Sequence, residues 1–283
     1  MKKYAIVTDS TTYLTEEQFT ELNIKRGSLN IIEGNDTFRE LDVENSLVYE
    51  KFDQGKRLTT SQPSPGDFLA IYEDLLKEDY DKIFVLVISE KLSGTYQSAK
   101  IALNMLDEPG KVHLFDSKLA AYGNEMLILM LNDMINQNVE YDDIIKKMDG
   151  YIANSELIMT SEDLVSMIRS GRLSKTKALI GTVLRIKPVV KMENGKLDLL
   201  TSSRTRAKAL EHVMQFMKDR MKQDYNKLYV RVCNHNSIEF ATKLKEEIER
   251  VYKNVELTFS NYIGPVFNVH VGPKGFGVSW TTE

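Results

Sequence analysis

The chain has 283 residues, of which 42% are hydrophobic, so it can bury the core of one large or two ordinary domains. Its 37 basic and 41 acidic residues give a formal net charge of -4, which argues against a nucleic-acid-binding protein of the usual basic kind. The single cysteine, Cys233, excludes an internal disulfide and a cysteine metal site. The N-terminus carries no signal-type apolar segment, and the longest apolar stretch, 126–131, is far too short to span a bilayer. We therefore expect a soluble cytoplasmic protein.

The first half of the chain alternates strand and helix patterns. Short β-type runs are predicted at 4–7, 83–88 and 112–115, and helices at about 65–77, 95–105, 122–137 and 141–154. Thr15 and Gln18 have capping-box spacing, so a helix is predicted to start there, and Ser64 is predicted to cap the helix that begins with Pro65. This alternation is typical of an α/β domain with a mainly parallel sheet flanked by helices.

The second half of the chain has a different pattern. Strands are predicted at 157–160, 187–193, 196–201, 228–233, 255–262 and 278–281, and helices at 162–169, from Ser174, at 204–222 and at 237–252. Asn194-Gly195 is the strongest short signal for a hairpin. We expect a C-terminal α+β domain with a mainly antiparallel sheet, and a division of the chain into domains 1–157 and 158–283.

Two hydroxyl-rich segments, Thr59 to Pro65 and Ser93 to Ala99, are each set between an apolar run and a helical pattern. Small donors at helix N-termini can hold an anion, because unpaired backbone N–H groups and the helix dipole point there. Ligands of open α/β sheets bind beyond the carboxyl ends of the strands. A set of polar residues is predicted at or near such ends: Asp9, Ser10, Thr60, Ser93, Asp116 and Ser117.

The sequence signatures of three kinds of functional site are absent. A serine hydrolase would carry Gly-x-Ser-x-Gly, which neither Ser61 nor Ser93 provides. The phosphate loops of nucleotide-binding proteins are absent, and the glycine-rich segment 272–277 precedes a strand pattern rather than a helix. Asp9, Asp116 and His270 could meet in space, but no local spacing supports a metal site. We predict no catalytic residue, no metal and no cofactor.

The segment from Arg169 to Lys191 holds seven basic residues and no acidic one, and Arg204, Arg206 and Lys208 follow. This segment is either a solvated face or a dock for an acidic partner, a phosphate or an anionic membrane surface. Arg172 and Arg206 are the predicted phosphate or partner contacts.

Together these motifs resemble the DegV family, which includes the fatty-acid-binding subunits of bacterial fatty acid kinase. The resemblance covers residues 8–277 in the family's order, and any one motif alone is weak. The matching segments are Thr8-Asp9-Ser10-Thr11, Thr60-Ser61-Gln62-Pro63-Ser64, Ser93-Gly94-Thr95-Tyr96-Gln97-Ser98-Ala99, Asp116-Ser117, Ser170-Gly171-Arg172-Leu173-Ser174, Lys187-Pro188-Val189, Ile263-Gly264-Pro265-Val266 and His270-Val271-Gly272-Pro273.

The resemblance implies that a long-chain fatty acid lies buried in the protein, with its carboxylate held by Thr60, Ser93 and His270. It also implies that the protein presents the fatty acid to a separate fatty acid kinase and carries the acyl phosphate to phospholipid synthesis. A protonated His270 would add a favourable charge. Phe267 replaces a small residue common in the family, and Lys274 interrupts its Gly-Pro-Gly pattern, so both bear on the headgroup site and the acyl-chain preference.

Two alternatives stay open at this point. One is an enzyme that acts on a small carboxylate or phosphate at the same loops. The other is a regulatory or interaction protein that binds a partner through the 169–191 surface and keeps a vestigial pocket.

Overall fold

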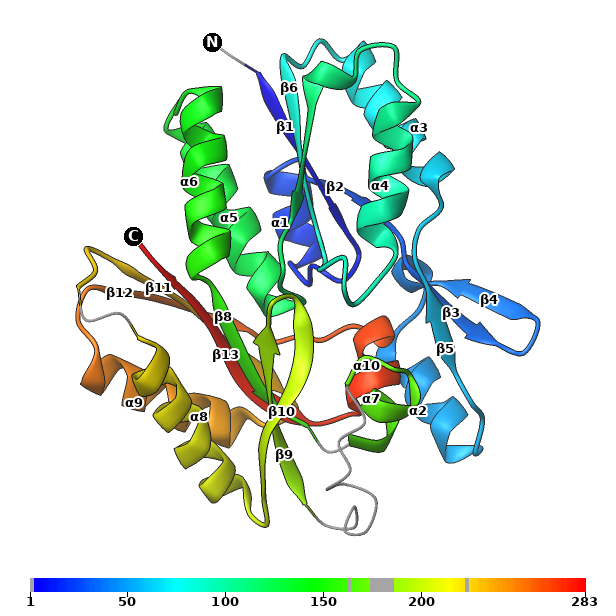
Figure 1. Cartoon of the computed structure of the whole chain (residues 1–283). Helices are drawn as coiled ribbons and strands as arrows, with labels where there is room; N and C mark the ends of the chain where they lie inside the picture. The colour runs from blue at the N-terminus through cyan, green and yellow to red at the C-terminus, as the bar shows by residue number, and fades with distance from the viewer. Residues whose placement is uncertain (1–2, 162–163, 174–185, 222–223) are drawn as a thin grey trace.

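The computed structural model describes residues 3–161, 164–173, 186–221 and 224–283 (Figure 1). A parallel sheet in the N-terminal half has the order β2-β1-β6-β7. Its strands are β1 (Tyr4–Asp9), β2 (Lys25–Gly27), β6 (Lys82–Val87) and β7 (Val112–Asp116). The residues of β6 from Ile83 to Val87 are fully buried, as expected for an apolar strand covered on both faces.

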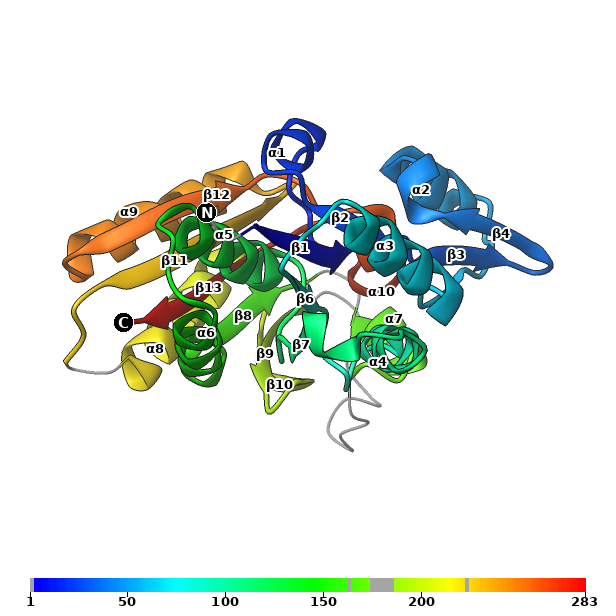
Figure 2. The same ribbon diagram turned by 90° about the horizontal axis from the view of Figure 1, so that it is seen from above.

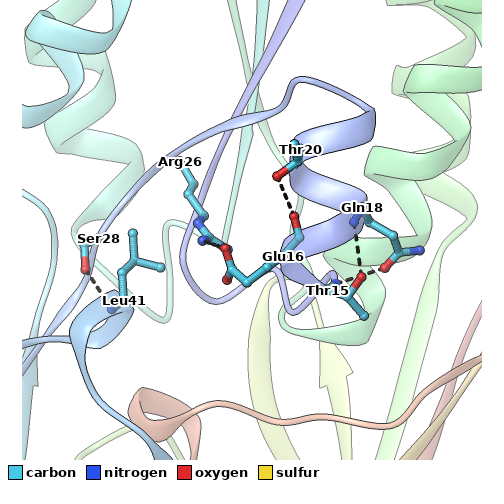
Figure 3. Close-up of polar contacts among 7 residues, drawn as sticks. All are labelled: Thr15, Glu16, Gln18, Thr20, Arg26, Ser28 and Leu41. Carbon is cyan, nitrogen blue, oxygen red and sulfur yellow. Dashed lines mark hydrogen bonds and ion pairs between the residues drawn. The ribbon is translucent and has the colours of Figure 1, made fainter.

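Helices cover both faces of this sheet. The helices α3 (Pro65–Lys77) and α4 (Thr95–Asn104) share one core with the sheet, whereas α1 (Glu16–Glu21) and α5 (Tyr122–Asn136) share the other. The predicted capping box at Thr15 and the predicted cap Ser64 are both present. Figure 3 shows the first: Gln18 N–H donates to Thr15 Oγ1 over 3.2 Å, and Thr15 N–H donates to Gln18 Oε1 over 2.9 Å. Ser64 caps α3 together with Asp67 in the same way. The predicted α/β arrangement is confirmed.

A second, six-stranded sheet occupies the C-terminal half in the order β10-β9-β8-β13-β11-β12. Its strands are β8 (Glu156–Thr160), β9 (Lys187–Glu193), β10 (Lys196–Ser203), β11 (Leu228–His235), β12 (Val255–Ser260) and β13 (Gly275–Thr282). All neighbours are antiparallel except β11 and β12. The predicted hairpin turn is present, because Asn194 and Gly195 have positive φ values of 51° and 80°.

The helix α5 lies between the two sheets. The helices α8 (Arg206–Arg220) and α9 (Ile238–Val251) cover one face of the second sheet, while α5 and α6 (Tyr141–Asn154) pack on the other (Figures 1 and 2). The largest apolar core accordingly joins residues of both halves, such as Phe84, Leu131, Met159 and Val190. The division at residue 157 stays a prediction. Within the described ranges, no helix is both long and apolar enough to cross a membrane.

Sequence reasoning missed a third sheet, of three short antiparallel strands in the order β4-β3-β5. They are β3 (Asn30–Glu33), β4 (Asp36–Arg39) and β5 (Thr59–Ser61). Thr60 was expected in a loop beyond the parallel sheet, and that expectation is wrong: it lies on β5 and pairs with Ile31. Strands of three or four residues are too short for their alternation to stand out from a loop.

Other elements complete the chain, and two of the helices were not predicted. These two are α2 (Asn45–Asp53) and α10 (Pro265–Val271); the 3-10 turns are η1 (Glu40–Asp42) and η2 (Pro109–Lys111). The predicted helix at 162–169 is observed as α7 (Leu164–Arg169). Ser161, which precedes this helix, donates its hydroxyl to the carbonyl of Val271 over 2.6 Å. The helix predicted from Ser174 lies outside the described residues.

Candidate functional site

Three elements that are distant in the sequence bring Thr60, Ser93 and His270 together. Thr60 lies on β5, Ser93 lies in the loop between β6 and α4, and His270 lies near the end of α10. Thr60 Oγ1 is 2.8 Å from His270 Nε2. All three side chains line one inner cavity of about 40 Å³. Apart from Arg172, the rest of its lining is apolar: Leu29, Ile88, Leu92, Leu197, Val266, Phe267 and Val271.

The two hydroxyl-rich segments are in direct contact. A methyl group added at Gly94 would come within 2.9 Å of the side-chain carbon Cδ of Gln62, so the Gln62 side chain lies directly against Gly94. Ser93 Oγ lies 2.9 Å from Thr95 Oγ1, the first residue of α4. This packing fixes the Ser93 hydroxyl on the same cavity as Thr60.

A larger, more open cavity of about 470 Å³ adjoins the inner one, and we call it the vestibule. The two cavities share Thr60, Arg172 and His270. Four basic residues line the vestibule, namely Lys56, Arg57, Arg169 and Arg172, and its described lining contains no acidic residue. Arg172 is fixed in place because its Nη1 donates to Ser170 O over 2.8 Å and its Nε to Leu92 O over 3.3 Å. The vestibule is therefore suited to an anionic group.

On its other side, the inner cavity adjoins a far cavity of about 20 Å³. The two share Phe267 and Val271. The far cavity is lined by Tyr122, Cys233 and Lys274, among others. The three cavities thus form a series that begins at cationic side chains and continues into the apolar interior.

Burial keeps His270 neutral. Desolvation and, to a smaller extent, the nearby Arg172 guanidinium lower the pKa of its imidazole to about 3. The favourable charge that a protonated His270 would add is therefore absent in the protein alone. A neutral imidazole has one N–H donor and one acceptor nitrogen. Nδ1 of His270 is buried and has no hydrogen-bond partner among the described residues.

The structure separates the two arginines that were predicted to contact a phosphate or partner. Arg172 lines both the vestibule and the inner cavity. Arg206 lies at the start of α8, with its guanidinium carbon 5.9 Å from the ring centre of Phe240, and it lines none of these three cavities. Of the basic run, Lys175, Lys177 and Arg185 lie outside the described residues.

Sequence reasoning missed Lys56 and Arg57 in the vestibule. They lie just before the Thr59-Thr60-Ser61 segment, separated from it by Leu58, and this proximity in the sequence was the only available signal. Among the described residues, no group of three or more His, Cys, Asp or Glu side chains is placed to hold a metal ion.

The fold and the site define a mixed α/β protein with a polar, cationic mouth that opens onto apolar cavities. The family model described as "Uncharacterised protein, DegV family" matches residues 3–283. A DegV domain-containing protein of Halalkalibacterium halodurans is 30% identical over the full length of both chains. The chain therefore belongs to the DegV family.

Solved structures of other proteins have the same fold. DegV from Bacillus subtilis, described as a fatty acid binding protein, is 29% identical, and the match covers 100% of both chains with a TM-score of 0.83. A DegV family protein from Thermus thermophilus, also described in terms of fatty acid binding, has a TM-score of 0.88 at 23% identity, with 99% of this chain and 100% of that chain covered. At 23% identity, the similarity to the Thermus thermophilus protein shows a shared fold and nothing more.

Proposed function

We propose that this protein binds a long-chain fatty acid, with the carboxylate at Thr60, Ser93 and His270 and the acyl chain in the apolar cavities behind them. The observation that carries this proposal is the position of those three polar side chains between the cationic vestibule and the apolar interior. The fatty-acid-binding description of the Bacillus subtilis relative supports it.

The energetics of such a ligand are favourable once the inner and far cavities, of about 40 and 20 Å³, widen to admit the acyl chain. Burying about fourteen methylene groups at ~0.8 kcal/mol each contributes on the order of 11 kcal/mol before the cost of association is subtracted. A carboxylate in an apolar site is costly unless it is hydrogen-bonded, and each hydrogen bond to a charged group stabilises it by roughly 1.5–3 kcal/mol. Ser93 offers one donor, and the hydrogen-bonded pair of Thr60 and neutral His270 offers one more. The tail would therefore supply the affinity, and these donors would set the orientation of the fatty acid.

The protein's role would be that of a carrier rather than an enzyme. We propose that it presents the carboxylate at the vestibule to a separate fatty acid kinase and carries the acyl phosphate toward phospholipid synthesis in the cytoplasm. The basic lining of the vestibule suits a phosphorylated headgroup and a transient contact with an anionic membrane surface.

The site offers little support for the alternative of a small-carboxylate or phosphate-processing enzyme. A general base works best when its pKa lies near the working pH, whereas the pKa of His270 is lowered to about 3. Ser93 Oγ is hydrogen-bonded to Thr95 rather than to a base. Neither hydroxyl therefore has an activating partner of ordinary basicity.

Native mass spectrometry of protein purified without detergent tests the proposal. We expect an adduct with the mass of a fatty acid, and much less of it in the double variant Thr60→Val, Ser93→Ala. Ser61→Ala is the matched control, because Ser61 follows Thr60 on β5 but lines none of the three cavities. A wild-type protein that is empty and also refuses added fatty acid would overturn the proposal.

A further inference from the structure

The helix α10 supplies a large part of the site, because Val266, Phe267, His270 and Val271 all line the inner cavity. The helix is only one and a half to two turns long. Helices of this length are not stable on their own in water, so contacts with the rest of the protein must fix its position.

A buried carboxyl group holds the start of α10. Glu40 is 4% exposed, and its Oε1 accepts a hydrogen bond from the backbone N–H of Val266 over 2.9 Å. The same Oε1 accepts from the hydroxyl of Tyr13 over 3.0 Å. That hydroxyl in turn accepts from the backbone N–H of Phe267 over 3.3 Å. Glu40 and Tyr13 thus satisfy N–H groups that the first turn of a helix leaves free.

The approach between these groups is close. A methyl group added at Gly264 would lie 2.3 Å from Cε1 of Tyr13 and 3.0 Å from Oε1 of Glu40. The absence of a side chain at Gly264 therefore allows the carboxylate to reach the helix. Glu40 Oε2 is occupied as well, since Ser10 donates its hydroxyl to it over 2.5 Å.

Glu40 is itself held on a fixed segment. Its backbone N–H donates to Leu29 O over 2.8 Å, and the next N–H, of Leu41, donates to Ser28 Oγ over 3.4 Å (Figure 3). A second set of hydrogen bonds holds α10 one turn further along the helix. Asn45, at the start of α2, accepts from Asn268 Nδ2 over 2.7 Å and donates to Ile263 O over 2.8 Å. The segment 40–45 thus holds α10 at its start and in its middle.

We propose that Glu40 is a positioning residue for the lipid site, which sets where α10 places His270 and Phe267 against the acyl chain and its carboxylate. This inference rests on the proposed function. None of the cavity linings given above includes Glu40, so its effect would pass through the helix rather than through contact with the lipid.

The ionisation of Glu40 gives the proposal a pH signature. Burial raises the pKa of this carboxyl to about 8. The titratable groups that face it are Asp9, whose pKa burial also raises, and the phenols of Tyr13 and Tyr262, whose pKa values burial raises as well. The phenols stay protonated near neutral pH. A buried carboxylate costs more than a buried carboxylic acid, so ionisation of Glu40 favours a looser α10.

The test compares Glu40→Gln and Glu40→Ala with wild type in a titration with a fluorescent polyene fatty acid from pH 6 to pH 9. We expect wild-type affinity to fall as pH rises through 8, Glu40→Gln to remove that dependence, and Glu40→Ala to weaken binding about tenfold at pH 6, the size expected for losing one strong hydrogen bond. Glu156→Gln is the control, because burial also raises the pKa of Glu156, which lies on β8 and pairs with Arg220 on α8 rather than with α10.

A second measurement does not need the lipid. Nitrogen NMR of the His270 ring reports its hydrogen bond to Thr60, and we expect this signal to shift in Glu40→Ala and to stay unchanged in Glu156→Gln. A His270 signal unchanged in Glu40→Ala, or a wild-type pH profile in Glu40→Gln, would overturn the positioning role. Failure of the wild type to bind any fatty acid would instead overturn the proposed function and leave the NMR result to judge Glu40.

Discussion

Thr60 and His270 are 210 residues apart in the sequence, yet their side chains are joined by a hydrogen bond of 2.8 Å. The bond connects a strand of the small third sheet to the last turn of α10. It therefore closes the inner cavity on the side of the vestibule, where a ligand headgroup would enter.

Removing His270 should weaken ligand binding without unfolding the protein. In His270→Ala the carboxylate loses one donor, and we expect an affinity loss of roughly 10–100-fold, corresponding to about 1.5–3 kcal/mol. Because the pKa of His270 is lowered to about 3 in the free protein, wild-type affinity should not follow the ordinary imidazole titration near pH 6.5. Isothermal titration between pH 5.5 and 7.5 measures both effects, and a step centred at pH 6.5 would contradict the second.

Shortening Phe267 should broaden the range of acyl chains that the protein accepts. The ring of Phe267 borders both the inner and the far cavity. In Phe267→Leu the smaller side chain would widen the connection between these two cavities. We expect relative affinity to shift toward bulkier or kinked chains, measured by competition between straight and unsaturated fatty acids. Phe68→Leu is the matched control, because Phe68 lies on α3, is buried in the core shared with α4 and lines none of the three cavities. An unchanged order of affinities in Phe267→Leu would contradict this role.

The protein should become more stable when Ala121 is replaced by glycine. Ala121 precedes α5 with φ 47° and ψ -121°, a conformation that a residue with a Cβ atom rarely adopts. Relief of this strain is of order 1–3 kcal/mol, and the extra freedom of glycine in the unfolded chain offsets about 0.4–1 kcal/mol of it. Chemical denaturation should show Ala121→Gly to be more stable by about 1 kcal/mol, whereas Ala120→Gly, the neighbouring control, should be less stable.

Stability should fall as the pH rises from about 4.5 to about 8, in part because of Glu40. Burial raises the folded-state pKa of Glu40 to about 8, above the ordinary value of 4.5. The folded state therefore holds this proton more tightly than the unfolded state, and the contribution is complete below pH 4.5 and lost through pH 8. Urea denaturation at several pH values should show a shallower decline in Glu40→Gln than in wild type. Identical slopes would contradict this assignment.

Breaking the buried ion pair of Glu125 and Arg231 should be severely destabilising. Arg231 donates from Nε and Nη2 to Glu125 Oε2 over 2.9 and 2.6 Å, and both side chains are buried. In Arg231→Met the carboxylate stays buried without its partner, and we expect a loss of about 3–5 kcal/mol. Arg231→Met with Glu125→Leu should recover much of this loss, since it leaves no unpaired charge.

The sequence predicts the layered regions of the fold well, because long apolar runs and cap residues determine them locally. The strand at 83–88 and the caps Thr15 and Ser64 are examples. It predicts the third sheet and α10 poorly, because their positions depend on distant contacts such as that between Glu40 and Val266. The same holds for the site. The resemblance to the family predicted the carboxylate-binding residues Thr60, Ser93 and His270. The lowered pKa of His270, in contrast, follows from burial that only the folded chain reveals.

The position of α5 between the two sheets has a mechanical consequence. The helix begins with Tyr122, which lines the far cavity and donates its hydroxyl to Ile158 O on β8 over 3.0 Å. Neither sheet can lose its packing without exposing this helix, so the two halves should melt as one cooperative unit rather than one after the other. A lipid that fills the far cavity would then raise the melting temperature of the entire chain.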